Sequence, residues 1–371
     1  MKSRAAVLFE AGKPLEICSV DVQDPKAGEV RIEIKAAGVC HTDLSVMTGS
    51  IKAPIPAILG HDCAMLVLDV VPGVTNCTSG DPVIHLCLLA CGECEYCDAR
   101  RPALCGEGTV IRSTGRLLAG TSRFSIDGKE ILHFAGVSSF SNYTVMPEGA
   151  VLKIPKELPF ELAALMGCSV ITGVGAVINA AKVKRGGTVA VFGAGCVGVN
   201  VVQGAAMSGA KTIIAVDRHS SRLDDALTFG ATHVINASDT DPVAEIRKLT
   251  GGLGVDYAFE AIGLSATIQQ AYNSLAKRGI AMTLGIAPAT TEVTISPVGL
   301  VYEERVLTGS LYGSSAPKTD IPMMIDLYTN GSLKLDELLS RTYPIEEINE
   351  AYDAMQSGET LRSVITCEAW V

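Results

Sequence analysis

Two different hydrophobic patterns follow one another along the chain. Up to about residue 170, short β-branched stretches such as 30–34 and 65–71 are separated by glycine, proline and cysteine clusters. This texture predicts a β-rich region with long functional loops. From about residue 172, apolar runs alternate with amphipathic stretches, which is typical of a different kind of domain.

The second region reads as strand, crossover and strand. An apolar strand at 188–192 leads through a glycine turn into an amphipathic helix at 197–208, and a second strand follows at 212–217. Further strands are expected at 255–261 and 280–285. This alternation predicts a parallel sheet with helices on both faces.

After about residue 312 the pattern changes once more. Helices are expected at 321–329 and 347–357, and a strand at 362–366. The sequence contains no internal repeat and no low-complexity segment.

Length and composition limit the classes of protein. A chain of 371 residues exceeds one ordinary core, and 48% hydrophobic residues with a positive mean hydropathy indicate a well-buried globular protein. A net charge of −10 without a basic run excludes a nucleic-acid or anionic-lipid partner. We find no apolar run that would act as a signal peptide or cross a bilayer, so we expect a cytoplasmic protein without a membrane partner.

Four of the twelve cysteines are closely spaced. Cys91, Cys94, Cys97 and Cys105 form a C-x2-C-x2-C-x7-C pattern within fifteen residues. Four thiolates fill the tetrahedral shell of one zinc ion, so the predicted role is structural. An iron–sulfur cluster and unligated thiols are the alternatives, because the tight triplet also resembles ferredoxin spacing.

A second set of candidate ligands is scattered along the sequence. Cys40, His61 and Cys168 supply two thiolates and one imidazole, which neutralise a divalent zinc and leave a fourth position for substrate oxygen. Asp43 and Asp62 are adjacent in sequence to these ligands and would orient the imidazole or modulate the charge of the site. Taken singly, each residue also has an ordinary structural explanation.

A glycine motif follows the first strand of the second region. Gly193, Gly195 and Gly198 give G-x-G-x-x-G between a strand and a helix, and Asp217 ends the next strand nineteen residues after the third glycine. The glycines permit a tight turn and close backbone approach to a pyrophosphate at the helix N-terminus. Asp217 accepts hydrogen bonds from the adenosine ribose and so favours NAD over NADP, although Arg218 weakens that choice.

Together these residues resemble the zinc-containing medium-chain alcohol dehydrogenases. Within that family they are similar to the branch that includes formaldehyde dehydrogenases and aryl-alcohol dehydrogenases. The resemblance runs nearly end to end and is carried by 38–43, 60–61, 91–105, 120–124, 140–144, 167–173, 193–198 and 357–362.

The resemblance implies an α/β fold in three segments. Residues 1–169 would form a GroES-like β-rich catalytic domain, 170–312 a Rossmann domain with a doubly wound parallel sheet, and 313–371 a return to the catalytic domain. The active site would lie in the cleft between the two domains. Two zinc ions per chain, one catalytic and one structural, and NAD are the implied cofactors.

The resemblance also assigns roles by motif position. The catalytic residues would be Cys40, His61, Cys168, Thr42, Ser45, Asp43 and Asp62. The cofactor-binding residues would be His41, Thr172, Gly193, Gly195, Val197, Gly198, Asp217, Arg222, Leu284 and Arg362. Thr42 would contact the substrate oxygen, and Ser45 stands where many relatives end a proton relay with histidine.

The implied reaction is reversible hydride transfer between a primary alcohol, aromatic or of medium chain length, and NAD. A dehydrogenase of S-hydroxymethyl-thiol adducts and an enzyme that retains its cofactor for an external acceptor are the alternatives. The loop at 45–54 has a lysine and no acid, which counts against glutathione adducts. A binding or structural protein is a further alternative, since the same fold includes zinc-free members, but such proteins need not retain the open ligand set of Cys40, His61 and Cys168. A small-molecule substrate and a homodimer, with a tetramer as alternative, complete the expectation.

Overall fold

The chain divides into two compact units in the computed structural model, which describes residues 1–367. The first unit comprises 1–168, 316–322 and the chain from 335 onward, and the second comprises 169–315 and 323–334. The first unit is therefore discontinuous in sequence.

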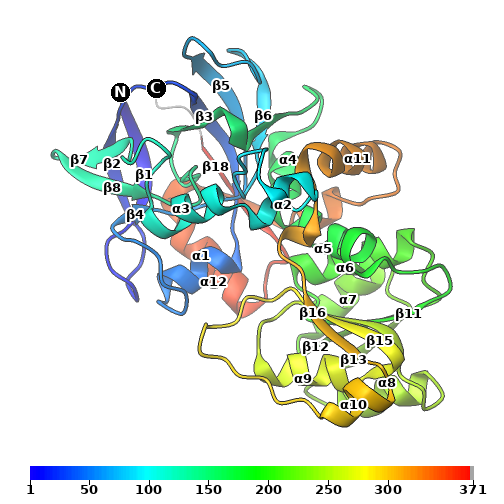
Figure 1. The fold of residues 1–371 in the computed structure, drawn as a ribbon. Coiled ribbons are helices and arrows are strands. Elements are labelled where there is room, and N and C mark those ends of the chain that lie inside the picture. The colour runs from blue at the N-terminus through cyan, green and yellow to red at the C-terminus, as the bar shows by residue number, and fades with distance from the viewer. Residues whose placement is uncertain (368–371) are drawn as a thin grey trace. The chain divides into compact units, whose positions relative to one another are not determined.

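A closed barrel and a mixed sheet form the first unit (Figure 1). The barrel strands, in spatial order, are β1 Lys2–Leu8, β2 Glu16–Val22, β7 Phe124–Ile126, β8 Lys129–His133 and β4 Ala57–Ile58. The sheet strands, in spatial order, are β10 Val151–Lys153, β6 Pro82–His85, β5 Cys63–Val70, β3 Glu29–Gly38, β18 Ser363–Thr366 and β17 Arg341–Pro344, and β9 Tyr143–Pro147 also pairs with β3. The predicted β-rich texture of this region is confirmed.

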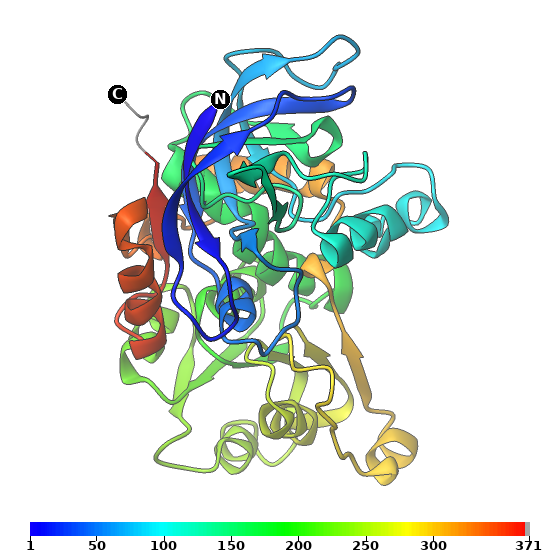
Figure 2. The same cartoon turned by 90° about the vertical axis from the view of Figure 1, so that its left-hand side faces the viewer.

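The C-terminal strand completes the sheet of the first unit. In β18, Val364 pairs with Gly38 of β3 in an antiparallel register. Figure 2 shows this strand, in red, on the same side of the molecule as β1. The pairing fixes the end of β3, from which the chain enters the first candidate site at Cys40.

Short helices connect the strands of the first unit. They are α1 His41–Met47, α2 Glu95–Asp98, α3 Gly106–Thr114, α4 Phe160–Leu165 and α12 Ile348–Ser357. Helix α11, Pro317–Thr329, starts four residues before the predicted position and belongs partly to each unit.

A six-stranded parallel sheet forms the second unit. Its strands, in spatial order, are β13 His233–Asn236, β12 Thr212–Asp217, β11 Thr188–Phe192, β14 Val255–Glu260, β15 Leu275–Thr283 and β16 Val306–Gly309. The helices of this unit are α5 Ile171–Gly175, α6 Cys196–Met207, α7 Ser220–Thr228, α8 Pro242–Leu249, α9 Ser265–Asn273 and α10 Pro297–Tyr302, and Figure 1 shows α8 and α9 beside the sheet. The strand order reverses between β11 and β14, which is where an open parallel sheet binds ligands.

One strand of this sheet begins earlier than its apolar pattern indicates. We predicted a strand at 280–285, but β15 starts at Leu275 and ends at Thr283. Its pairing with β14 is irregular between Val255 and Tyr257, and Arg278 has a φ of 63°. A polar, irregular segment hides the start of the strand, because hydrophobic periodicity detects only its regular part.

One helix of the chain is unusually long and apolar. The segment Phe160–Ala181 is long and apolar enough to cross a bilayer by length and composition alone. The prediction that no run in this chain has that character is therefore wrong. Because 78% of its most apolar window is buried within the protein, we describe it as a core helix.

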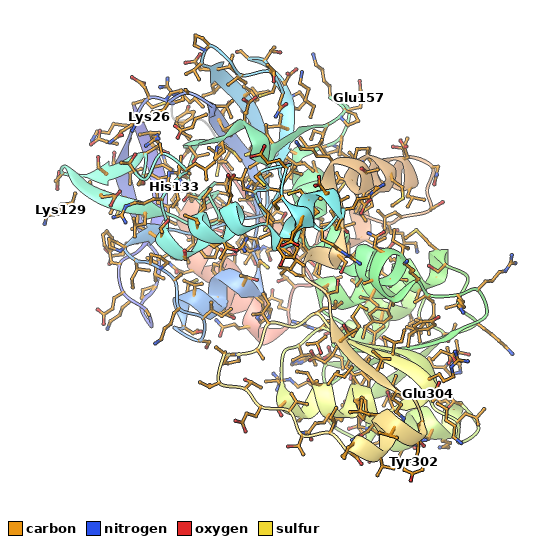
Figure 3. The ribbon with its side chains drawn as sticks, in the orientation of Figure 1. Lys26, Lys129, His133, Glu157, Tyr302 and Glu304 are labelled. Carbon is orange, nitrogen blue, oxygen red and sulfur yellow. The ribbon has the colours of Figure 1, made fainter. Side chains whose placement is uncertain are left out.

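His133, at the end of β8, links the stability of the first unit to pH (Figure 3). Its ring lies 4.6 Å from that of Phe124, and its Nε2 accepts a hydrogen bond from the backbone N–H of Arg123. Burial, assisted by the Arg123 charge, lowers the pKa of His133 from 6.5 to about 3. Below pH 6.5 the unfolded chain therefore binds a proton that the folded chain excludes.

We expect the free energy of unfolding to fall with pH partly because of this residue. Between pH 7.5 and 5 its contribution amounts to about 2 kcal/mol. The substitution His133→Gln keeps a neutral acceptor, so urea titrations should show a shallower pH dependence than wild type. If the pH dependence of the free energy of unfolding is the same in His133→Gln and wild type, His133 is not its cause. His85 is a second buried imidazole and is present in both proteins, so its contribution is the same in each.

Candidate functional site

Three elements of the first unit bring Cys40, His61 and Cys168 together. Cys40 follows β3 and caps α1, and His61 lies between β4 and β5. Cys168 lies in a π-helical turn, Met166–Val170, within the long apolar helix. Such turns re-aim a side chain within a helix and are frequent at functional sites.

A glycine next to Cys168 allows the helix to approach a strand closely. A Cβ added to Gly167 would lie 2.8 Å from the carbonyl oxygen of His85 in β6. Since a Cβ atom does not tolerate that distance, this packing requires glycine at position 167. The close approach places the thiol next to the imidazole of His61.

The three ligand atoms fit one metal ion. The Sγ atoms of Cys40 and Cys168 and a nitrogen of His61 all lie within 4.8 Å of one another, and Sγ of Cys168 is 3.5 Å from Nε2 of His61. Zinc bonds of about 2.3 Å to sulfur and 2.0–2.1 Å to nitrogen place neighbouring ligands at roughly such separations. Two thiolates and one imidazole match a three-ligand zinc site that keeps its fourth position open.

Asp43 fixes the orientation of the imidazole. Its Oδ2 lies 3.0 Å from Nδ1 of His61, and its Oδ1 accepts a hydrogen bond of 2.9 Å from the N–H of Gly60. The carboxylate is fully buried. Because Nδ1 faces Asp43, Nε2 faces the two thiols, which is the orientation that metal coordination requires.

The charges around this site favour a cation. Burial opposes protonation of His61, yet Asp43, Cys87 and Cys40 together raise the pKa of its imidazole well above the ordinary value. A hydrogen bond with Cys168 lowers the pKa of Cys40, while the same contact raises that of Cys168. The thiols thus share protons in a crowded anionic environment, which a divalent ion would neutralise.

Asp62 is engaged with a residue from the far end of the chain. Arg362, just before β18, forms a buried ion pair with Asp62 and donates to the carbonyl oxygen of Val39 at 2.7 Å. Burial raises the pKa of Asp62 to about 6, although Arg362 opposes that shift. The pair ties β18 to the segments that carry the two nearest ligands, Cys40 and His61.

The remaining predicted catalytic residues lie on α1. The hydroxyl of Thr42 is 3.8 Å from Sγ of Cys40, and Thr42 is half-buried. Ser45 is also half-buried and lies three residues further, so both lie on one side of the helix. His41, predicted to contact the cofactor, is exposed at the start of α1.

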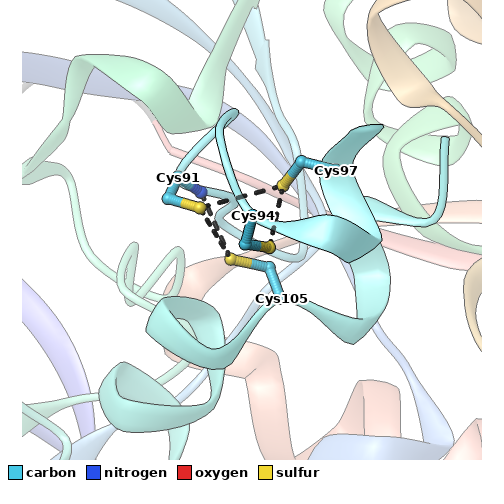
Figure 4. Close-up of side chains that lie close together, drawn as sticks. All are labelled: Cys91, Cys94, Cys97 and Cys105. Carbon is cyan, nitrogen blue, oxygen red and sulfur yellow. Dashed lines mark hydrogen bonds between the residues drawn. The ribbon is translucent and has the colours of Figure 1, made fainter. Parts of the chain in front are cut away.

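The four clustered thiols form the second candidate metal site (Figure 4). Sγ–Sγ distances are 3.9 Å for Cys91 and Cys97, 3.6 Å for Cys94 and Cys97, and 3.5 Å for Cys91 and Cys105. Tetrahedral zinc at about 2.3 Å from each sulfur separates its ligands by roughly 3.8 Å. The spacing fits a single ion, because a cluster places several irons and sulfides between its thiolates.

The backbone around one of these thiols, Cys105, favours thiolate, whereas burial raises the pKa of Cys97. Burial opposes ionisation of Cys105, but N–H groups, including that of Cys91 at 3.3 Å, lower its pKa to about 7. All twelve cysteines lie within the described residues and are free thiols. Unpaired thiols in this arrangement fit a structural zinc site rather than a disulfide framework.

The glycine turn of the second unit has the geometry its spacing predicts. Gly193 has a φ of 93°, and Gly195 caps α6. A Cβ on Gly198 would collide with the carbonyl group of Gly193. Helix α6 therefore starts directly against the end of β11. The free N–H groups at the N-terminus of α6 can bind an anion.

Asp217, at the end of β12, is hydrogen-bonded to this turn. Its Oδ2 accepts from the N–H of Ala194 at 2.8 Å, and its Oδ1 accepts from the N–H of His219 at 3.0 Å. The guanidinium of Arg222 lies close enough to Gly195 that an added Cβ would be 3.0 Å from it. Both charged residues thus border the turn, as a ribose-binding pair must.

The other predicted cofactor residues of this unit are half-buried. They are Thr172 on α5, Val197 on α6 and Leu284 after β15. Leu284 donates its N–H to the carbonyl oxygen of Glu260 at 2.7 Å.

Two further residues, His85 and Cys87, act on the groups of the three-ligand site. Nδ1 of His85 lies 2.7 Å from the carbonyl oxygen of His61, and burial lowers the pKa of His85 to about 4, which keeps the ring neutral. Interaction with Cys168 lowers the pKa of the Cys87 thiol, although burial opposes that shift. His85 has no sequence signal, whereas the family resemblance implies Cys87, which lies outside the four-thiol pattern, as a wall of the substrate pocket.

Two family models match the chain. A model described as "Alcohol dehydrogenase GroES-like domain" matches residues 26–156, and one described as "Zinc-binding dehydrogenase" matches residues 196–330. The first model includes the residues of both candidate metal sites except Cys168. The second includes every strand of the parallel sheet except β11.

Known proteins resemble the chain over nearly its whole length. It is 43% identical to "Alcohol dehydrogenase class-3" of Cereibacter sphaeroides and 42% identical to "S-(hydroxymethyl)glutathione dehydrogenase" of Paracoccus denitrificans, in each case over 98% of this chain and all of the relative. The crystal structure of benzyl alcohol dehydrogenase from Acinetobacter calcoaceticus superimposes with a TM-score of 0.92 at 33% identity, covering 99% of this chain and 100% of that one.

Proposed function

We propose a specific reaction on the premise that this chain belongs to the family of zinc-dependent, NAD-linked alcohol dehydrogenases. The chain oxidises the S-hydroxymethyl adduct of a small thiol to a thioester, with NAD as hydride acceptor. The observation that carries the proposal is the convergence of Cys40, His61 and Cys168 on a three-ligand metal site. The names of the relatives at 42% and 40% identity, both S-(hydroxymethyl)glutathione dehydrogenases, favour the thiol adduct over a plain alcohol.

The residues of each unit take separate roles in this proposal. A zinc ion held by Cys40, His61 and Cys168 would supply a Lewis acid that polarises the substrate oxygen. Asp43 keeps Nε2 of His61 directed at the metal position. Thr42 accepts the proton of the substrate hydroxyl, because its own hydroxyl lies beside a ligand thiol. Ser45 continues the proton path on the same side of α1.

In the second unit the chain's own groups would hold NAD. The first N–H groups of α6 bind the pyrophosphate, and the absence of side chains at the turn admits it closely. Asp217 and Arg222 bind the adenosine ribose. The carboxylate of Asp217 repels a 2′-phosphate, so NAD is preferred over NADP.

Aromatic alcohols are the second candidate substrates. This is the substrate class that we expected from the sequence, and the similarity to the benzyl alcohol dehydrogenase supports it. The loop at 45–54 carries exposed Lys52 and no acidic residue, which disfavours recognition of the ammonium group of glutathione. The thiol partner is therefore left to experiment.

Initial rates distinguish the two candidates. We expect kcat/KM with formaldehyde plus a thiol to exceed that with benzyl alcohol by at least ~10-fold, because the thiol part of the adduct offers binding contacts that a plain alcohol lacks. Glutathione, cysteine and 2-mercaptoethanol should be compared, each with NAD and NADP. A higher kcat/KM with benzyl alcohol alone than with formaldehyde plus a thiol would contradict the proposal and favour aromatic alcohols as substrates. NADH absorbance that survives dialysis would instead indicate a retained cofactor and an external acceptor.

An exposed apolar patch on the second unit supports a homodimer. Val298, Val301 and Tyr302 of α10 are 58%, 74% and 82% exposed, and Val306 on the edge strand β16 is 44% exposed. Figure 3 shows Tyr302 and the neighbouring Glu304 projecting from this end of the unit. In the described chain β16 pairs only with β15, so its other side is available to the same strand of a second copy.

A charge in this patch is expected to separate the dimer. Light scattering on wild type should give twice the chain mass of 38.8 kDa, and Val301→Lys together with Val306→Lys should give 38.8 kDa, because two buried lysines per copy would be unpaired. Leu118→Lys, at a residue 54% exposed in the first unit, is the matched control and should stay dimeric. A tetramer that persists in the double variant would contradict this interface.

We place the protein in the cytoplasm as part of the proposal. Twelve free thiols, seven of them in metal sites, require a reducing compartment.

A further inference from the structure

A buried carboxylate lies at the end of β14, where the strand order of the second unit reverses. Glu260 is the last residue of that strand and is 1% exposed, and it pairs in register with Phe192 of β11 and Thr283 of β15. The glycine turn follows Phe192 directly. Glu260 therefore lies at the edge of the sheet that is expected to bind NAD, and no motif in the sequence pointed to it.

One oxygen of this carboxylate holds the turn that follows the strand. Oε1 of Glu260 accepts hydrogen bonds from the N–H groups of Ile262 at 3.0 Å and Gly263 at 2.7 Å. It also accepts a hydrogen bond of 2.7 Å from the hydroxyl of Thr267, in the first turn of α9. Because a buried N–H group without an acceptor is costly, the conformation of the 261–264 turn depends on this oxygen.

The 261–264 turn packs directly against the glycine motif. A Cβ added to Gly193 would lie 2.6 Å from Cγ1 of Ile262. On the other side of the turn, a Cβ added to Gly285 would collide with the backbone nitrogen of Gly263. The position of Ile262 therefore limits where Gly193, and with it the start of α6, can lie.

We propose that Glu260 is a positioning residue for NAD. Through its hydrogen bonds to the 261–264 turn, it holds Ile262 against Gly193 and so keeps the first N–H groups of α6 directed at the pyrophosphate. The proposal rests on the proposed function only in taking the second unit as the NAD site. Glu260 acts through the turn and not by contact with the cofactor, so the expected effect is on cofactor affinity and not on hydride transfer.

The test compares cofactor affinity with the rate of turnover in the zinc-loaded full chain. NADH is titrated by fluorescence, and kcat and KM for NAD are measured with the substrate that gives the higher kcat/KM in wild type. Leucine fills a similar volume without accepting hydrogen bonds. We expect Glu260→Leu to weaken NADH binding about tenfold and to raise KM for NAD to a similar extent, with kcat within about threefold of wild type.

Two conservative variants separate the hydrogen bonds of Glu260 from its charge. Glu260→Gln keeps an acceptor oxygen at the same reach, so its NADH affinity should stay within about twofold of wild type. Glu260→Asp keeps the charge but is one methylene too short to reach the turn, so it should bind NADH about fivefold more weakly than wild type. Both variants keep a polar group at the buried position, so their comparison decides the matter even if Glu260→Leu fails to fold.

Asp256, near the start of the same strand, provides a matched control. Its Oδ2 accepts hydrogen bonds of 2.8 Å from both the N–H and the hydroxyl of Thr188 on β11. Asp256→Leu removes these bonds between the same two strands, but at the end of the sheet opposite the glycine turn. Its NADH affinity should stay within about twofold of wild type, because ligands bind at the carboxyl ends of the strands.

Three results would overturn the positioning role. They are wild-type NADH affinity in Glu260→Leu, an equal loss of affinity in Asp256→Leu, and a larger loss in Glu260→Gln than in Glu260→Asp, which would assign the effect to the charge. Failure of the proposed function gives a different result. If wild type binds no NADH, the NAD site itself is wrong, whereas NADH binding that Glu260→Leu leaves unchanged contradicts the positioning role alone.

Discussion

Replacement of Cys168 by alanine is expected to lower the rate of substrate oxidation by at least ~10³-fold, because a polarising metal ion is worth several kcal/mol and each 1.36 kcal/mol is a factor of ten. The remaining Cys40 and His61 form only two of the three ligands that converge within 4.8 Å. The variant should therefore contain one zinc per chain instead of two. Elemental analysis and initial rates of NADH formation measure the two effects.

NADH binding is the control that separates chemistry from folding. The glycine turn and Asp217 belong to the second unit, so fluorescence titration should give an NADH affinity within about threefold of wild type. Cys168→Asp keeps an anionic ligand and should retain zinc with part of the activity. Wild-type turnover by Cys168→Ala, or two zinc ions in that variant, would exclude the three-ligand site as the source of activity.

Residue type and spacing were sufficient to predict the sites whose residues lie close together in the sequence. The four thiols at 91–105 and the glycine motif at 193–198 act through neighbours in sequence, so their spacing already constrains their geometry. The alternation of strands and helices after residue 172 predicted the parallel sheet for the same reason. Strand β15 was predicted to start five residues late, because its polar start departs from the pattern, and to end two residues late.

The three-ligand site needed the resemblance, because its members are far apart. Cys40 and Cys168 are separated by 128 positions, and nothing in their local sequence requires that they meet. The motif positions of the family predicted that these residues share one metal ion, and the distances between the three ligand atoms fit one ion. The assignment of proton-relay roles to Thr42 and Ser45 stays a prediction.

The surroundings of that site were not predictable from sequence. The pair of Asp62 and Arg362 joins residues 300 positions apart, and the sequence assigned both residues to the site without indicating that they pair. His85 reaches the carbonyl oxygen of His61 through the register of β5 and β6, which side-chain chemistry does not encode. Such contacts depend on sheet register, and a shift by one residue would turn His85 to the other face.

The substrate is determined by still finer features. The sequence led us to expect an aromatic or medium-chain alcohol, while we propose the thiol adduct from the name of the relative at 42% identity. Zinc ligands and glycine motif are the same for both reactions, so they carry no information on this choice. Selectivity between such substrates arises from loop side chains, where one methylene is worth only about 1–3 kcal/mol.

The four-thiol site is expected to stabilise a segment that has little core of its own. Of residues 91–105, only Ala103 and Cys105 are buried, and helix α2 has no buried residue. Cys94 and Cys105 cap α2 and α3, so the metal would connect the starts of both helices. Because zinc binding in such a lobe supplies its folding free energy, losing one ligand should be costly.

We therefore expect Cys105→Ser to lower the apparent unfolding temperature by roughly 10 °C, which corresponds to several kcal/mol for a domain of this size. Zinc content should fall from two to one per chain, and protease cleavage should appear between 91 and 105, because the lobe without its ion has too few buried contacts to stay folded. Cys18→Ser makes the same chemical change at a half-buried thiol outside both sites and should shift the midpoint by less than about 3 °C. A Cys105→Ser protein that keeps two zinc ions and the wild-type midpoint would show that this lobe folds without its metal.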